Sequence, residues 1–240
     1  MKYNLFKYRI ITDDKLIYKD DYLYHLFLNV VKKNDNENTR NLFQIYLNHL
    51  NEENVLISPK RKLYMCPLTD IYKACLGTGY FEYIIVSEIL KSDRLFSYVS
   101  LDDILFEEQV ITVKPIDYKN LVADINHTYQ IKNKFFNFNI VKLSNNFTTG
   151  INLHKYRVGK YEFQLYKATI ERALFDVFLY EYKNKIRLLN DNDYDLSEFN
   201  NRKFYDIINY VIKDSTYKNY INSRFQNIIK CYTINEEMFL

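Results

Sequence analysis

The 240 residues include 33 Lys and Arg against 30 Asp and Glu, and 17% of them are aromatic. So aromatic a chain does not belong to the disordered class, and its length allows one large domain or two small ones. Only 4 Gly and 3 Pro occur, which argues against the glycine-rich phosphate loops of Rossmann and P-loop proteins.

No part of the sequence has the features of a membrane or secretory protein. The N-terminus, up to Asp14, carries five charged side chains around no apolar core, and no run of about eighteen apolar residues occurs. The three cysteines, Cys66, Cys75 and Cys231, form no CxxC pair, which disfavours a disulfide framework or a zinc site. We therefore expect a cytoplasmic protein that binds no membrane, no metal and no cofactor.

The positive charge is concentrated near the N-terminus. Residues 1–75 contain 12 Lys and Arg against 9 Asp and Glu, whereas the remaining 165 residues contain 21 of each. The whole excess of three positive charges therefore lies in the first third of the chain. This is a modest electrostatic footprint for a protein that binds a polyanion.

The first third of the chain is predicted to contain two helices. Residues 3–18 alternate short apolar runs with charges, which is typical of a strand pair or an irregular start. Residues 22–31 (YLYHLFLNVV) predict a buried helix, and the polar segment 32–38 interrupts it. Thr39 is a suitable N-cap for a second helix that runs to about Leu50. Its apolar side chains share one face at helical spacing: Phe43, Tyr46, Leu47 and Leu50.

The opposite face of this second helix is polar and carries Arg40, Asn41, Gln44 and Asn48. A hairpin pattern follows, whose cationic tip consists of Lys60, Arg61 and Lys62. Two helices and a basic hairpin follow one another in this order in a winged helix-turn-helix. Amide side chains can bond to adenine and Arg to guanine, while basic side chains bind phosphates. We expect the polar face to read bases in operator DNA and the tip to hold its backbone.

Another structure would produce the same pattern. An amphipathic helix with a solvated polar face, beside a charged hairpin, needs no DNA at all. A helix-turn-helix also has a short helix before the recognition helix, and only the polar segment 32–38 is left for it here. The two interpretations stay open at this point.

The rest of the chain predicts a mixed body. Residues 66–109 are expected to be mostly helical. Four segments then alternate with period two, as half-buried strands do: 110–113, 129–131, 136–140 and 161–165. Helical patterns follow at 169–184, 196–213 and 216–232. The sequence therefore predicts an α+β protein with a winged-helix head over residues 1–75 and an α/β body over 76–240 that ends in helices.

The sharpest local motif lies in residues 167–178 (KATIERALFDVF). Thr169 is expected to cap a helix, and Glu171 lies in its first turn, where a carboxylate is favoured. Arg172 and Asp176 are four residues apart and are predicted to form an exposed ion pair worth about 0.2–0.5 kcal/mol. The buried side of the helix is predicted to carry Ile170, Leu174, Val177 and Phe178.

This motif resembles the "A-x-x-E-R/K-A/T-L-x-D" helix of the AbiEi antitoxin family. The preceding segments 138–142 (FNIVK) and 147–150 (FTTG) are similar to the part of that family's body that lies before its motif. The resemblance is most specific over residues 130–185. It implies a non-catalytic antitoxin of a phage-defence operon, which represses its own operator through a winged helix. It also implies that the body opposes a nucleotidyltransferase-like toxin.

Two other functions remain open. Glu171, Asp176, Glu181 and Lys183 faintly resemble the acidic residues and the E-x-K of a metal-dependent nuclease. Their spacing on one helix points them in different directions, which disfavours a shared metal site. A viral or host protein-interaction module is the other alternative, since residues 59–62 (PKRK) could serve as a nuclear import signal.

Overall fold

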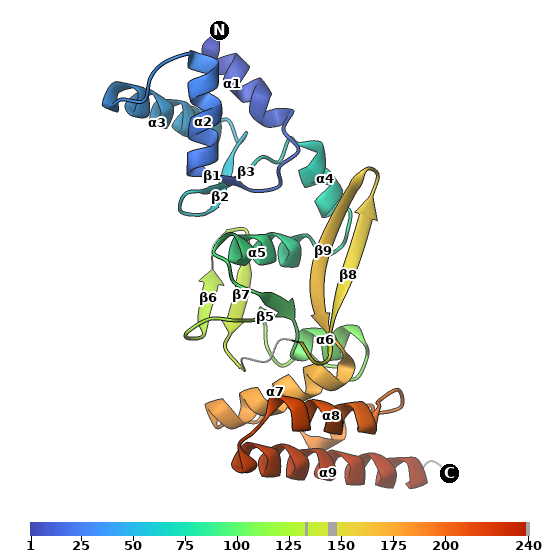
Figure 1. The fold of residues 1–240 in the computed structure, drawn as a ribbon. Coiled ribbons are helices and arrows are strands. Elements are labelled where there is room, and N and C mark those ends of the chain that lie inside the picture. Colours follow the sequence, from blue (N-terminus) through green and yellow to red (C-terminus); the bar gives the residue numbers. More distant parts are fainter. Residues whose placement is uncertain (133, 144–147, 239–240) are drawn as a thin grey trace. The chain divides into compact units, whose positions relative to one another are not determined.

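The computed structural model describes residues 1–132, 134–143 and 148–238 of the chain (Figure 1). The chain is an α+β protein whose described residues form two compact units. The first unit contains residues 1–92, 134–136 and 155–163, and the second contains the other described residues. These two units do not test the DNA-binding and antitoxin roles assigned to residues 1–75 and 76–240, which stay predictions. From here on, "the head" means residues 1–66 only, and "the body" means the second unit only. Both are narrower than the ranges predicted from the sequence.

The head consists of three helices and a small antiparallel sheet. Its elements follow in the order α1 (Lys2–Ile11), β1 (Tyr18–Lys19), α2 (Asp20–Val31), α3 (Glu37–Glu52), β2 (Ile57–Lys60) and β3 (Leu63–Met65). The strand order is β1-β3-β2, so β3 lies in the middle and pairs Tyr64 with Tyr18 and Met65 with Ile57. The strand pair or irregular start expected over residues 3–18 was wrong, because most of this segment is α1.

A single apolar core holds the head together. Each helix contributes side chains three, four or eight residues apart, which is the spacing that places them on one helical face. Full burial of one such side chain contributes about 1.5–3 kcal/mol. The buried core residues are Phe6, Ile10, Tyr18, Leu23, Phe27, Val31, Phe43, Leu47, Leu50, Val55, Leu56 and Cys66.

The turn between α2 and α3 corrects the predicted N-cap of α3. Asn36, not Thr39, is the N-cap of α3: its Oδ1 accepts hydrogen bonds from the backbone N–H and from Oγ1 of Thr39, each at 2.9 Å. Thr39 lies inside the helix on its buried face. Residues 32–36 form no helix, as the polar segment indicated, and the helix that precedes α3 is α2 itself. Lys32 ends α2 in the left-handed conformation, with φ of 53°.

The remainder of the first unit is mainly helical. It contains α4 (Asp70–Leu76), which Thr69 caps, and α5 (Phe81–Ser92). The buried residues of α5 are all aliphatic: Ile84, Ile85, Val86, Ile89 and Leu90. The expectation of a mostly helical segment over residues 66–109 is confirmed, with one short strand inserted at residues 97–99.

A six-stranded mixed sheet has the strand order β6-β7-β5-β4-β9-β8. Its strands are β4 (Ser97–Val99), β5 (Lys119–Ala123), β6 (Tyr129–Lys132), β7 (Asn137–Val141), β8 (Ile151–Val158) and β9 (Tyr161–Ala168). The neighbours β5 and β7 are parallel, as are β4 and β9, whereas the central pair β5 and β4 is antiparallel. Strands were correctly predicted at 129–131, 136–140 and 161–165. The strand predicted at 110–113 was wrong, because only Ile111 there forms an isolated bridge, to Tyr194.

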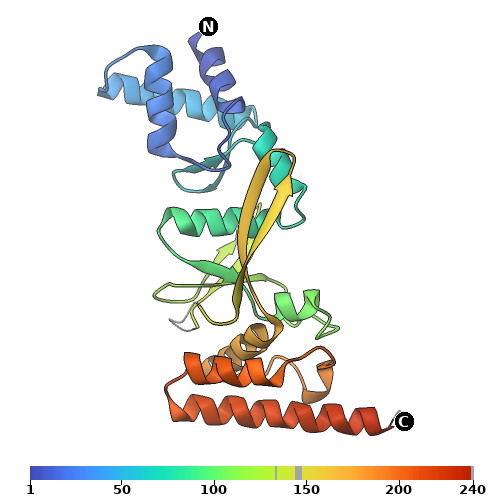
Figure 2. The ribbon, with the colours of Figure 1, turned by 45° about the vertical axis from the view of Figure 1, so that its right-hand side comes forward.

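Helices complete the body. The short α6 (Asp102–Glu107) follows β4, and β9 leads directly into α7 (Ile170–Asn184). A short 3-10 helix (Asp191–Asp193), α8 (Asn201–Val211) and α9 (Ser215–Met238) follow. Figures 1 and 2 show α7 between the strands and the pair of α8 and α9, and it contacts α6, α8 and α9. Because other elements cover α7 on several sides, little of its surface is left for solvent.

Candidate functional site

The polar face of α3 is exposed, as the amphipathic pattern predicted. Asn41, Gln44 and Asn48 are exposed, whereas Phe43 and Leu47 on the opposite face are buried. Sequence reasoning did not single out Ile45, which also points outward and is 51% exposed. Residues 41, 44, 45 and 48 are neighbours on a helix surface. They form a continuous strip, which we call the α3 strip.

Arg40 is exposed too, but its guanidinium interacts with Asp35 and Tyr24, which lie outside the α3 strip. Its Nε and Nη2 donate to the two carboxylate oxygens of Asp35, each at 2.8 Å. The hydroxyl of Tyr24 donates to the same carboxylate at 2.7 Å, and the guanidinium carbon lies 5.3 Å from the Tyr24 ring centroid. The hydrogen bonds from Arg40 and Tyr24 hold the pKa of Asp35 well below its usual range. Arg40 is therefore directed toward α2 and the turn.

The cationic tip lies at the end of the β2–β3 hairpin. Lys60, Arg61 and Lys62 are all exposed. The Ser58 hydroxyl donates to the backbone carbonyl of Lys60 and also lies 3.0 Å from that of Leu63. Lys62 has a φ of 62°, and its carbonyl accepts a hydrogen bond from the Asp20 N–H at 3.0 Å. These interactions give the tip a defined backbone conformation.

The motif on α7 is arranged differently from the prediction. Thr169 does cap the helix, since its Oγ1 accepts a hydrogen bond from the Arg172 N–H at 3.3 Å. The ion pair of Arg172 and Asp176 is correct in its partners, with Nε 3.0 Å from Oδ1, but both side chains are 0% exposed. The prediction of an exposed pair was wrong because helical spacing identifies a second face of α7 but not what covers it.

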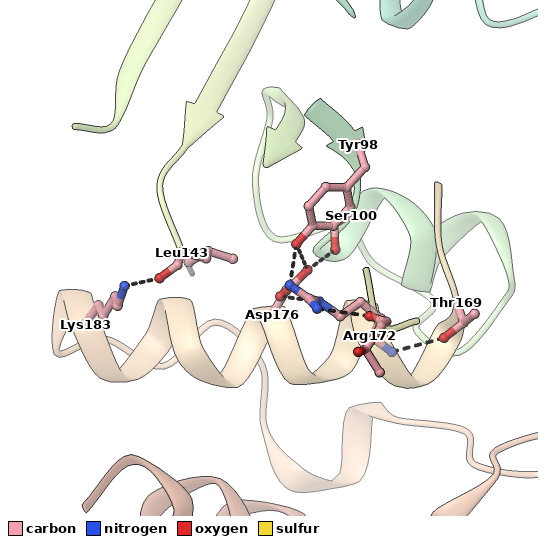
Figure 3. Close-up of polar contacts among 8 residues, drawn as sticks. Tyr98, Ser100, Leu143, Thr169, Arg172, Asp176 and Lys183 are labelled. Carbon is pink, nitrogen blue, oxygen red and sulfur yellow. Dashed lines mark hydrogen bonds and ion pairs between the residues drawn. The ribbon is translucent and has the colours of Figure 1, made fainter. Parts of the chain in front are cut away.

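A polar cluster surrounds the buried ion pair (Figure 3). The Asp176 carboxylate accepts hydrogen bonds from the hydroxyls of Tyr98 at 2.9 Å and Ser100 at 2.7 Å. Arg172 donates to the Tyr98 oxygen at 2.8 Å and to the Thr149 carbonyl at 3.0 Å. Burial raises the pKa of Tyr98 well above its usual value, so its hydroxyl remains a donor. The cluster thus joins α7 to β4 and to the segment before β8.

The residues considered for a nuclease do not converge. Asp176 belongs to the cluster just described, and Glu171 accepts a hydrogen bond from the Asn200 N–H at 3.3 Å. Glu181 pairs with Arg224 at 3.3 Å, and Lys183 donates to the Leu143 carbonyl. Within the described part of the chain, no group of three or more His, Cys, Asp or Glu could hold a metal ion. Each of these side chains therefore has its own structural partner.

Sequence reasoning missed a second buried polar cluster, at the start of α6. Asp102 is 0% exposed, and its carboxylate accepts hydrogen bonds from the Asn120 side chain at 2.7 Å and the Ile116 N–H at 3.1 Å. The neighbouring Asp103 pairs with Lys114 at 2.5 Å. Burial, followed by the charge of Asp103, raises the pKa of Asp102 to about 7. The adjacent acidic pair was the available signal, but nothing local indicated burial.

No described helix has both the length and the apolar character needed to cross a membrane. The resemblance to the AbiEi family included Phe147, which lies outside the described residues. No protein-family model matches the chain, and no curated protein matches its sequence.

Proposed function

We propose that the chain is a non-catalytic, DNA-binding regulator whose head is a winged helix-turn-helix. The observation that carries the proposal is the order α1-β1-α2-α3-β2-β3 with a β1-β3-β2 sheet, in which α3 presents an amide strip to solvent. In such a head the helix after the turn enters the major groove, which is wide enough for one α-helix. α3 follows α2 through a short turn and has the place of the recognition helix.

The cationic tip supplies the phosphate contacts that the strip lacks. α3 carries Arg40 as its one Lys or Arg, so phosphate binding must come from other elements. Lys60, Arg61 and Lys62 are exposed at the end of a hairpin with a defined backbone, where a wing would lie. Basic side chains that contact phosphates contribute affinity and orientation without sequence preference.

A salt titration of DNA binding tests this proposal. We expect replacement of Lys60, Arg61 and Lys62 by Gln to weaken binding of the full chain to every duplex. The slope of log K against log salt should fall by about one for each phosphate that the variant no longer neutralises. The matched control replaces three exposed cations of the body: Arg202, Lys203 and Lys213. An unchanged slope in the tip variant, or an equal change in the control, would refute the assignment.

The antitoxin role is part of the same proposal and rests on the resemblance over residues 130–185. Because Arg172 and Asp176 are buried, we assign the motif to the stability of the body and not to a contact with the toxin. The test is co-expression with the adjacent gene, where we expect a nucleotidyltransferase-like toxin whose growth arrest this chain relieves. Persistent arrest with folded chain present would contradict the role. Magnesium-dependent cleavage of DNA by the purified chain would contradict a non-catalytic function.

A further inference from the structure

The composition of the α3 strip suggests which bases it can recognise. Three of its four side chains are amides (Asn41, Gln44 and Asn48), and the fourth is the aliphatic Ile45. None of the four carries a charge. Two carboxylates, Glu37 and Glu52, lie about one turn beyond either end of the strip, and both are exposed. Their charge is repelled by phosphates, so the uncharged middle of α3 is the part suited to the groove.

The chemistry of the major groove matches this composition to one kind of base pair. An Asn or Gln amide can donate to N7 and accept from N6 of adenine in a bidentate contact. The thymine of the same pair presents a C5-methyl group, which an aliphatic side chain can contact. Guanine presents two acceptors instead, which suit Arg or Lys. An amide strip that includes an isoleucine is therefore complementary to A·T pairs.

Arg40 is the one side chain of α3 suited to guanine, and its partners direct it elsewhere. The bidentate pair with Asp35, at 2.8 Å for both bonds, draws the guanidinium toward the turn. Tyr24, on α2, stabilises this position in two ways. Its hydroxyl donates a hydrogen bond to Asp35, and its ring makes a cation–π contact with the Arg40 guanidinium. The edge of the guanidinium that carries Nε and Nη2 is occupied by Asp35, so a bidentate contact of this edge with guanine would require Arg40 to leave Asp35 without its cation.

We infer that the head selects A·T-rich operator sites, with Asn41, Gln44 and Asn48 bonding to adenines and Ile45 packing against thymine methyl groups. Asp35 contributes to this selectivity because it keeps Arg40 away from the groove. The inference rests on the proposed DNA-binding function and adds its base specificity. Asp35 and Tyr24 are accordingly positioning residues that act through Arg40.

Selection from a pool of random duplexes tests the inference with the full chain. We expect A·T pairs to be enriched at the positions facing α3, and replacement of one such pair by G·C to weaken binding about 5- to 150-fold. Substituting uracil for thymine removes only the C5-methyl group. It should weaken binding several-fold for the wild type and by a smaller factor for Ile45→Ala, whose shorter side chain contacts less of the methyl group.

Two variants of the turn test the role assigned to Arg40. Asp35→Ala releases the guanidinium of Arg40. We then expect guanine to be enriched in the selected duplexes at the base pair nearest the start of α3. Arg40→Ala should leave the selected bases unchanged, because Arg40 does not read them in the wild type. Enrichment of G·C pairs by the wild type, or altered base selection by Arg40→Ala, would overturn the inferred base specificity. The proposed DNA-binding function would not be affected by either result. Failure to bind any duplex would instead refute the proposed function, and the inference with it.

Discussion

The head and the body bury different kinds of side chain. In the head, where every residue is described, the core is aliphatic and aromatic, Thr39 is the buried polar residue, and no charged side chain is buried. The body buries several charged side chains: Asp102, Asp103, Lys167, Glu171, Arg172, Asp176, Glu181 and Arg224. The head keeps its ion pairs, such as Arg40 with Asp35 and Lys7 with Glu53, at the surface.

This difference predicts how each region responds to pH and to amino-acid substitution. An apolar core depends on volume and shape, and it is insensitive to pH. A buried ion pair is costly to dehydrate, and removal of one partner leaves the other charge buried without compensation. We therefore expect the body to be the region that responds strongly to pH and to single charge changes. Hydrogen exchange resolved by peptide can measure the stability of head and body separately.

The largest expected effect is that of Arg172→Met. The change leaves the buried Asp176 carboxylate without its cation, so we expect the body to lose about 3–5 kcal/mol of unfolding free energy. Urea-dependent hydrogen exchange of the α7 peptides measures this loss. Arg40→Met in the head is the matched control, because its pair is exposed and should matter far less.

The double variant Arg172→Met with Asp176→Leu makes the comparison sharper. It replaces the buried pair by apolar side chains, so much of the lost stability should return. A single-variant loss below about 1 kcal/mol would mean that the buried pair is not a principal element of the body.

The second effect is a pH dependence confined to the body. The pKa of Asp102 in the folded state is about 7, above the usual value near 4, so the folded body holds a proton that the unfolded chain releases between these values. The stability of the body should therefore fall as pH rises through this window, by about 2–4 kcal/mol.

Exchange measured at about pH 5 and pH 8, after correction for intrinsic rates, checks the sign. Asp102→Asn should reduce the dependence, because it replaces the carboxyl by a group that does not ionise in this range. Burial also raises the pKa of Asp176, whose contribution of the same sign should remain. Asp103 and Lys114 remain present in that variant, so any dependence that they cause would persist. A body that gains stability from pH 5 to pH 8 would contradict the account.

The smallest expected effect lies in the head. Asn36→Ala removes the acceptor for the Thr39 N–H at the start of α3, and we expect a loss of about 1 kcal/mol, within a range of 0.5–2 kcal/mol. The effect should not depend on pH. Asn200→Ala is the matched control, since Asn200 caps α8 in the same way and should lower the stability of the body instead. Equal losses in both regions from either variant would show that head and body do not unfold separately.

The fold was predictable where a local pattern decides the structure. Periodicity placed the helices at residues 20–31, 37–52 and 170–184 to within a few residues, and Thr169 identified the start of α7. Strands such as β4 and β5 were missed because they are short and carry no alternation of polar and apolar residues. α1 was missed because its weak pattern, with charges among short apolar runs, also fits strands.

The sequence by itself determined which side chains share a face of a helix, as it did for Asn41, Gln44 and Asn48. Only the tertiary structure decided what lies opposite each face. Tyr98 and Ser100 contact Asp176 although they are 78 and 76 residues away in the chain, and Asp35 engages Arg40 through the conformation of a turn. The reason is physical: spacing along a helix is a local property, whereas burial and pairing depend on atoms supplied by distant segments.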